Sequence, residues 1–478
     1  MKRKSILYSF LLSATLSLNG CTDWLDVTPN AQINKETMYE TPQGFRDNLF
    51  GIYLTMTSSS LYGCDMTYGF MDELAQYYTT YQNTAHTYYE AVQYNYANKE
   101  VQKRIKSIWL GAYNAIANCN LLLENLKEKG TSFFPGNDAA LIEGEVLALR
   151  AYLHFDMLRA FTPQFGVGTG QGIPYADRFT SEVFPQLTAQ GTADRIVGDL
   201  GKARNLLKDI DPVLKDSYKT MNYHFDDPWD YNAPFYCYRG YRMNYYAVTA
   251  LMARVYFFMG KGELAYEFAM EVVKAAEEGR LTFTKESELS AALTTRDVVM
   301  QNEVIFALND QTIHKTYNNF NEEGNSAFEI NGLTSLYPVA TDFRRVYLTM
   351  KNARSRDISL KYADVSSSKG KKIPMLRLSE MYYIACETGF ARHQNVVVPM
   401  FDKICTYRGA PTVTGKVEEA DFINRVMLEA RREFLGEGQA FFWAKRLNKP
   451  VYRGNTPITL SPEQFTLPLP TAEEEFRK

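Results

Sequence analysis

Apolar residues recur at helical spacing along most of the chain. After Ile105 they lie at offsets of 3, 4, 7, 8 and 11, which marks one face of a helix. A second helix is predicted over residues 139–161, where an apolar stripe recurs at the same spacing. Thr41 and Pro42 combine an N-cap residue with proline at the first helical position, and they predict a helix that ends near Met56. These patterns indicate a mainly α-helical fold.

Two further helical patterns, residues 244–259 and 262–277, are separated by a turn at Gly260-Lys261-Gly262. Tyr256 and Ala265 lie nine residues apart around this turn, and Ala269 follows four residues later, as in tetratricopeptide repeats. The clearest strand pattern is residues 302–308. We therefore predict tetratricopeptide-like helical-hairpin repeats with long irregular loops and few short strands.

Four long polar segments interrupt the helical patterns: residues 57–97, 212–242, 309–345 and 363–372. The first is rich in Tyr, Ser and Thr, and the second contains the run DDPWDYNAPFYCYRGYR. Irregular segments of this length are typical of binding loops, so these segments are where we expect ligand contacts.

Composition narrows the class of protein. Of 478 residues, 33 are Tyr, 29 Phe and 4 Trp, an unusually aromatic chain. The net charge is −3 and no basic stripe is present, which argues against nucleic-acid binding. No apolar run reaches the 18 or more residues expected of a membrane-spanning helix.

The first residues have the pattern of an export signal. Met1–Lys4 is basic, Ile6–Leu18 is apolar, and Leu18-Asn19-Gly20-Cys21 resembles the lipobox of bacterial lipoproteins. We expect residues 1–20 to be a lipoprotein signal peptide and Cys21 to carry the lipid. The remaining five cysteines show no CxxC spacing, so neither a disulfide framework nor a zinc site is predicted.

Motifs for catalysis or cofactor binding are absent from the sequence: there is no HExxH, GxSxG or Walker A motif, and the five histidines are scattered. We therefore predict no cofactor, no metal and no catalytic residue. Glu429, Glu433 and Glu437 recur on one helix face among basic residues, and we interpret them as a solvated or ion-paired surface. A carboxylate pair for glycoside hydrolysis depends on separation in space, which sequence does not give.

Several segments together resemble the SusD/RagB family of outer-membrane lipoproteins. In chain order they are CTDWLDVTP from Cys21, TPQGFRDNLFGIY from Thr41, the helix with Trp109, Tyr113, Ile116 and Asn120, the helix with Gly144, Glu145, Arg150, Ala151 and Tyr152, LRLSEMYYIA from Leu376, EARREFLGEGQ from Glu429, and LPLP from Leu467. Ala430, Ala440 and Trp443 depart from the family pattern, which suggests a divergent branch.

The resemblance implies an outer-membrane lipoprotein, anchored through Cys21 and exposed at the cell surface. Such a protein binds a nutrient, a glycan or a peptide, and delivers it to a SusC-type TonB-dependent transporter without catalysis. It also implies an N-terminal SusD-like region over residues 21–240 and a C-terminal region over residues 241–478 that holds the helical repeat pair. We expect the two regions to form one unit.

Aromatic rings suit glycan binding because they pack on the C–H faces of sugars, while neighbouring polar groups bond the hydroxyls. The family supplies no fixed binding motif, so our candidates come from the loops of this sequence. They are Tyr77, Tyr78 and Tyr81; Trp229, Asp230, Tyr231 and Asn232; and Tyr317, Asn318, Asn319 and Phe320.

Two other functions fit the same sequence. A surface glycan-degrading enzyme would use a carboxylate pair, and a helical-repeat scaffold for another envelope protein would bind no small ligand. The family resemblance favours the binding protein.

Overall fold

The computed structural model describes residues 35–168, 170–215, 233–236, 238–322, 327–363 and 371–475. The expected signal peptide and Cys21 lie outside the described residues. The candidate site residues Trp229, Asp230, Tyr231 and Asn232 lie outside them as well.

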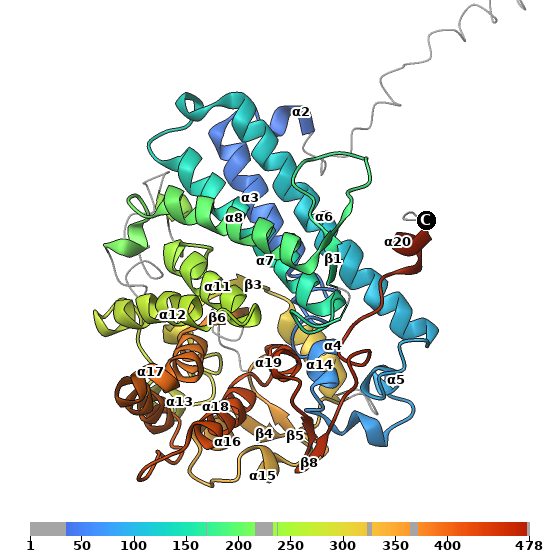
Figure 1. Ribbon diagram of the computed structural model, residues 1–478, viewed down its shortest axis with the longest axis vertical. Coiled ribbons are helices and arrows are strands. Elements are labelled where there is room, and N and C mark those ends of the chain that lie inside the picture. Colours follow the sequence, from blue (N-terminus) through green and yellow to red (C-terminus); the bar gives the residue numbers. More distant parts are fainter. Residues whose placement is uncertain are drawn as a thin grey trace, which may run out of the picture.

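Four helices that pack on one another form most of the N-terminal half, drawn in blue to green in Figure 1. They are α3 (Pro42–Met56), α6 (Lys99–Lys129), α7 (Asp138–Phe161) and α8 (Ala189–Leu207). The predicted N-cap is confirmed, since the Thr41 hydroxyl accepts a hydrogen bond from the Gly44 N–H. Helix α7 packs against both α6 and α8 and is buried on nearly every side. Its buried charged residues are ion-paired, as in the contacts of Arg150 with Asp199 and of Arg159 with Asp156.

A second layer of helices follows in the order α11 (Tyr245–Phe258), α12 (Gly262–Glu277), α17 (Leu378–Tyr407) and α18 (Glu419–Glu433). The predicted hairpin is confirmed: α11 packs on α12 through a turn at Gly260, whose φ of +70° favours glycine. Ala265 and Ala269 are fully buried at this contact. Tyr256 lies at the edge, partly exposed and stacked on Phe268, rather than in the core.

Strands are short and paired in antiparallel ribbons. β3 (Val304–Asn309) pairs with β6 (Lys372–Arg377), which confirms the strand predicted at 302–308 with its start two residues later. The other ribbons are β1 (Gln171–Pro174) with β2 (Gln186–Thr188), β4 (Thr349–Lys351) with β5 (Asp357–Ser359), and β7 (Val451–Arg453) with β8 (Thr456–Ile458). The predicted fold class, mainly helical with few short strands, is confirmed.

Two segments that we expected to be irregular contain short helices instead. Residues 57–97 hold α4 (Phe70–Leu74), the 3₁₀ turn η2 (Thr79–Gln82) and α5 (Tyr89–Val92), and residues 309–345 hold α14 (Ile313–Glu322), α15 (Leu333–Leu336) and the start of α16 (Phe343–Tyr347). Much of the first segment is buried, because tyrosine rings pack inward while their hydroxyls find hydrogen-bond acceptors.

The other short α-helices of the described residues are α2 (Lys35–Met38), α10 (Ala233–Tyr236), α13 (Glu286–Leu289), α19 (Ala440–Leu447) and α20 (Thr471–Glu475). The other 3₁₀ turns are η3 (Thr131–Phe133), η4 (Pro212–Leu214), η5 (Arg239–Tyr241) and η6 (Gln301–Glu303).

The glutamates that we interpreted as a solvated or ion-paired surface are ion-paired but buried. Glu433 is 2% exposed, and its carboxylate contacts three guanidinium groups: Arg408 at 2.6 Å, Arg377 at 2.6 Å and Arg344 at 3.0 Å. Although burial would raise its pKa, these cations hold the pKa of Glu433 well below its usual range. We call Glu303, Glu429, Glu433 and Glu437 with Arg344, Arg377 and Arg408 the buried ion cluster.

Removing the central carboxylate should destabilise the protein strongly. In Glu433→Gln three buried guanidinium groups lose their shared counter-charge, so we expect the free energy of unfolding to fall by about 3–5 kcal/mol. Urea unfolding followed by circular dichroism measures this loss. Glu128→Gln, an exposed site on α6, is the control and should leave the midpoint unchanged. Equal midpoints for the two variants would contradict a structural role for the cluster.

Candidate functional site

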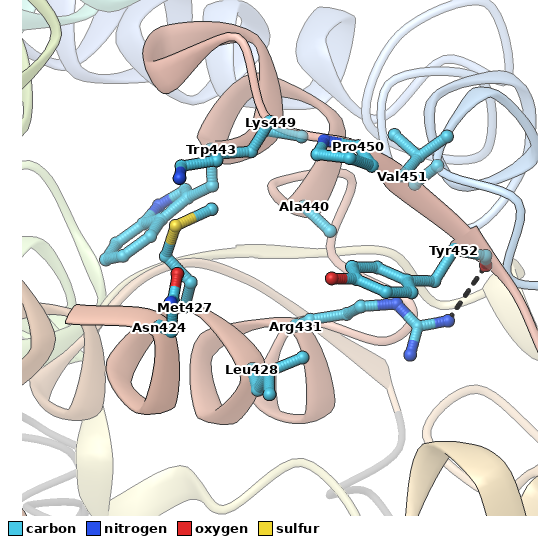
Figure 2. A pocket seen from close by; sticks show the side chains of 12 residues that line it. Asn424, Met427, Leu428, Arg431, Ala440, Trp443, Lys449, Pro450, Val451 and Tyr452 are labelled. Carbon is cyan, nitrogen blue, oxygen red and sulfur yellow. Dashed lines mark hydrogen bonds between the residues drawn. The ribbon is translucent and has the colours of Figure 1, made fainter. Parts of the chain in front are cut away.

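A cavity of ≈ 370 Å³ opens between α18, α19 and β7, within the size range of small-molecule sites (Figure 2). We call it the α18–β7 pocket. Its lining combines aromatic, aliphatic and cationic side chains, and it consists of Ala75, Asn424, Met427, Leu428, Arg431, Ala440, Trp443, Ala444, Lys449, Pro450, Val451 and Tyr452.

The helical period of α18 divides its residues between two faces. Asn424, Met427, Leu428 and Arg431 follow offsets of 3, 4 and 7 and line the pocket. The opposite face carries Glu429 and Glu433 into the buried ion cluster, so the cluster fixes how the helix presents its outer side.

A glycine-dependent turn joins α18 to α19. Gly436 and Gly438 have φ values of +86° and +68°, and a Cβ on Gly438 would lie 2.1 Å from the Met66 carbonyl oxygen. After α19, Asn448 adopts a left-handed conformation (φ 47°) and turns the chain toward Lys449, Pro450 and β7. These two turns bring α19 and β7 to the same cavity.

Two aromatic residues stand on opposite sides of the pocket (Figure 2). Trp443 is 7% exposed and packs against Phe257 and Phe434, with ring centroids 4.9 and 5.4 Å away. Tyr452 is partly exposed, and its hydroxyl is directed toward the cavity (Figure 2). With the aliphatic residues between them, the two rings form walls on which the C–H face of a sugar ring can pack.

The polar lining residues are Arg431, Lys449 and Asn424. Arg431 donates one hydrogen bond from Nη2 to the Tyr452 carbonyl oxygen at 3.0 Å, and its guanidinium lies 5.4 Å from the Tyr77 ring centroid and 5.5 Å from that of Tyr452. Among the described residues, the lining contains no carboxylate and no imidazole, the side chains that serve as acid and base in glycoside hydrolysis.

The structure places three of the predicted ligand residues inside the core. Tyr77, Tyr78 and Tyr317 are each 1% exposed, and their rings pack with other aromatic side chains. The hydroxyl of Tyr77 donates to the Arg431 carbonyl oxygen, and that of Tyr317 donates to the Ser359 carbonyl oxygen at 2.9 Å. We correct the prediction for these three: their rings and hydroxyls are used within the fold and present no surface to a ligand.

Four other predicted residues remain accessible. Tyr81, Asn318 and Phe320 are partly exposed and Asn319 is exposed. Tyr81 lies beside β7, where the Arg453 guanidinium is 4.2 Å from its ring centroid. Within residues 57–97, Tyr81 is therefore an accessible tyrosine next to β7, the strand that carries Tyr452.

Sequence reasoning missed Trp443, Tyr452 and Arg431 as site residues. Trp443 was visible as a departure from the family pattern, but it was interpreted only as a sign of a divergent branch. Tyr452 lies in a strand of three residues, which is too short for a period to be recognised.

Two adjacent buried carboxyl groups lie on α4, next to the pocket residue Ala75. Asp72 accepts hydrogen bonds from the N–H groups of Gly436 (2.6 Å) and Gly438 (3.0 Å), and Glu73 accepts one from the Thr80 hydroxyl (2.7 Å). Glu73 Oε2 has no partner among the described residues. Burial raises the pKa of each carboxyl group to about 8.

Within the described residues, no group of three or more His, Cys, Asp or Glu side chains is placed to hold a metal ion. None of the described helices combines the length and apolar character needed to cross a membrane. The described cysteines Cys64, Cys119, Cys386 and Cys405 are buried free thiols.

The Glu73 carboxyl group should make stability fall as pH rises. The pKa of Glu73 is about 8 in the fold and about 4.5 in an exposed glutamate, so between pH 4.5 and 8 the folded state holds a proton that the unfolded state releases. The stabilisation that this proton gives is lost as the pH rises through that range. We expect the free energy of unfolding to fall by roughly 3 kcal/mol between pH 5 and 8 for this reason. Glu73→Gln removes the proton-binding group, so its thermal midpoint should fall less steeply over this range. The exposed control Glu128→Gln should follow the wild-type profile, and a Glu73→Gln profile as steep as the wild type would refute the assignment.

Comparison with known proteins gives one family match. Residues 23–226 match a SusD-like family model described as starch-binding and associating with the outer membrane. A SusD-like protein of Formosa agariphila is 28% identical over 149 residues, which cover 30% of this chain and 25% of that protein. The match thus spans about a quarter of the length of this relative.

Solved structures share the fold over nearly the whole chain. A SusD superfamily protein from Bacteroides thetaiotaomicron has a TM-score of 0.71 at 20% identity, over 91% of this chain and 98% of its own. A SusD-like carbohydrate-binding protein from Bacteroides vulgatus has a TM-score of 0.66 at 17% identity, over 87% of this chain and 86% of its own. At these identities the likeness establishes the fold.

Proposed function

We propose that the chain belongs to the SusD/RagB family, and that it is an outer-membrane lipoprotein that binds a glycan and delivers it to a SusC-type TonB-dependent transporter. The description of the matched family, starch-binding and associating with the outer membrane, supports both the ligand class and the location. A structural neighbour named as carbohydrate-binding supports the ligand class.

One observation in the structure carries the proposal: the α18–β7 pocket has aromatic walls and no carboxylate in its lining. The walls suit a sugar ring, and the absence of an acid–base pair from this lining favours capture over hydrolysis there.

Glycan binding at the pocket should depend on Tyr452. Removing this ring in Tyr452→Ala deletes one wall, and we expect affinity to weaken about tenfold, the equivalent of roughly 1.4 kcal/mol. Calorimetric titration of the full chain in detergent against a panel of soluble oligosaccharides measures the change. Tyr238→Ala removes a tyrosine that is 41% exposed and is not part of the pocket, so it should bind as the wild type does.

The same mixtures also test catalysis. We expect the number of reducing ends to stay constant during incubation with each bound oligosaccharide. New reducing ends that follow the protein through purification would contradict a pure binding role. Equal affinities for Tyr452→Ala and Tyr238→Ala would contradict the assignment of the pocket.

Membrane attachment should depend on Cys21. We propose that its thiol carries the lipid, so Cys21→Ala should move the protein from the membrane pellet to the soluble fraction in the host cell. Immunoblotting of the two fractions measures the distribution. Cys64→Ala, which alters a buried thiol in the fold, is the control and should stay in the pellet. A Cys21→Ala protein that stays in the pellet to the same extent would refute the lipid anchor.

A further inference from the structure

The α18–β7 pocket contains a positive charge that no carboxylate of the described residues neutralises. Buried arginines elsewhere in the described residues contact carboxylates: Arg46 contacts Asp138, Arg150 contacts Asp199 at 2.7 Å and Arg254 contacts Glu380 at 2.5 Å. Arg431 has no carboxylate within ion-pair distance among the described residues, although its neighbour on α18, Arg432, pairs with Glu429 at 2.8 Å.

The surroundings of Arg431 compensate its charge only in part. Its Nη2 donates to one backbone carbonyl, its buried Nε has no acceptor among the described residues, and two tyrosine rings lie against the guanidinium. Burial lowers the pKa of Arg431, which is the signature of a cation taken out of water without a full counter-charge. Arg431 as a whole is partly exposed, so an anion that enters the cavity can reach this incompletely compensated cation.

A second cation stands at the rim of the same pocket. Lys449 is exposed, lines the cavity, and extends in the direction of Trp443 (Figure 2). With no acidic side chain in the lining, Arg431 and Lys449 give the pocket a positive potential between its two aromatic walls. A neutral sugar would use the walls but would leave this charge uncompensated.

We propose that the α18–β7 pocket binds the carboxylate of an acidic glycan, a chain that contains uronic acid residues. The planar guanidinium of Arg431 matches a carboxylate and bonds it through two parallel N–H groups. Lys449 attracts the anion from the rim, and Trp443 and Tyr452 hold the C–H faces of the sugar ring. This inference rests on the proposed glycan-binding function and specifies the ligand class.

The test compares ligands that differ only in charge. The full chain in detergent is titrated calorimetrically with oligogalacturonate, oligoglucuronate and oligomannuronate, each beside its neutral methyl ester, and with neutral oligosaccharides. We expect at least one acid to bind ten or more times tighter than its ester in 50 mM salt, with a smaller ratio in 500 mM salt. In Arg431→Gln the preference for the acid over its ester should shrink to the roughly threefold contribution of Lys449.

Three further variants separate binding from folding, because Arg431 also contacts the Tyr452 backbone. Lys449→Gln changes an exposed side chain, so it should keep the wild-type melting temperature and weaken the acid about threefold with no effect on the ester. Lys106→Gln, an exposed lysine on α6, should change neither ligand. Arg431→Lys keeps the positive charge but lacks the two parallel N–H groups of the guanidinium. Its affinity for the acid should therefore lie between those of the wild type and Arg431→Gln.

The outcomes distinguish this inference from the function on which it rests. Equal affinity for every acid and its ester, or binding of neutral oligosaccharides alone, would overturn the acidic-glycan assignment and leave glycan capture standing. A C-terminal peptide carboxylate that binds tighter than its amide, with no saccharide bound, would overturn both. An acid preference that Lys449→Gln and Arg431→Gln leave unchanged would overturn the assignment to this pocket.

Discussion

The carboxylate of Glu433 is the contact on which the C-terminal half depends. It joins α18 to Arg377 at the end of β6, to Arg408 at the end of α17, and to Arg344 in α16. These partners come from segments far apart in the sequence, so a single side chain fixes four elements relative to one another. Buried ion pairs are costly to assemble and costly to break, and they therefore favour one arrangement of the helices over others.

The orientation of α18 links this cluster to the pocket. Residues two positions apart on a helix point to nearly opposite sides, so when Glu433 and Glu429 face inward, Arg431 faces the cavity, and Leu428 lies three positions before it on the same face. Beyond the helix, Gly436 and Gly438 donate to Asp72 and hold the next turn against α4. The pocket is thus built on elements fixed by buried polar contacts. Its aromatic walls are in place before a ligand arrives.

Much of the fold could be predicted from the sequence because helices with one buried face have a clear period. The helices around Trp109, Tyr152 and Ala265 were predicted for this reason. The glutamates of α18 were placed wrongly, since a spacing of four residues is the same for a solvated face and for a buried one whose arginine partners are distant in sequence. Tyr77 and Tyr317 were misplaced because tyrosine suits both a core with hydrogen-bond acceptors and a binding surface. Choosing between these uses requires the neighbours in space, which only the structure supplies.

The two faces of α18 have different roles, one in the buried ion cluster and one in the pocket lining, and this difference bears on how ligand preference can change. Its inner face is constrained by charges that must remain paired, whereas Asn424, Met427 and Leu428 on the outer face line a cavity and belong to no ion pair of the described residues. Substitutions at these three positions change the shape and polarity of the pocket without disturbing the helix that carries it. Changes at these three positions can therefore alter which ligand fits the pocket, while the paired charges on the inner face keep the helix in place.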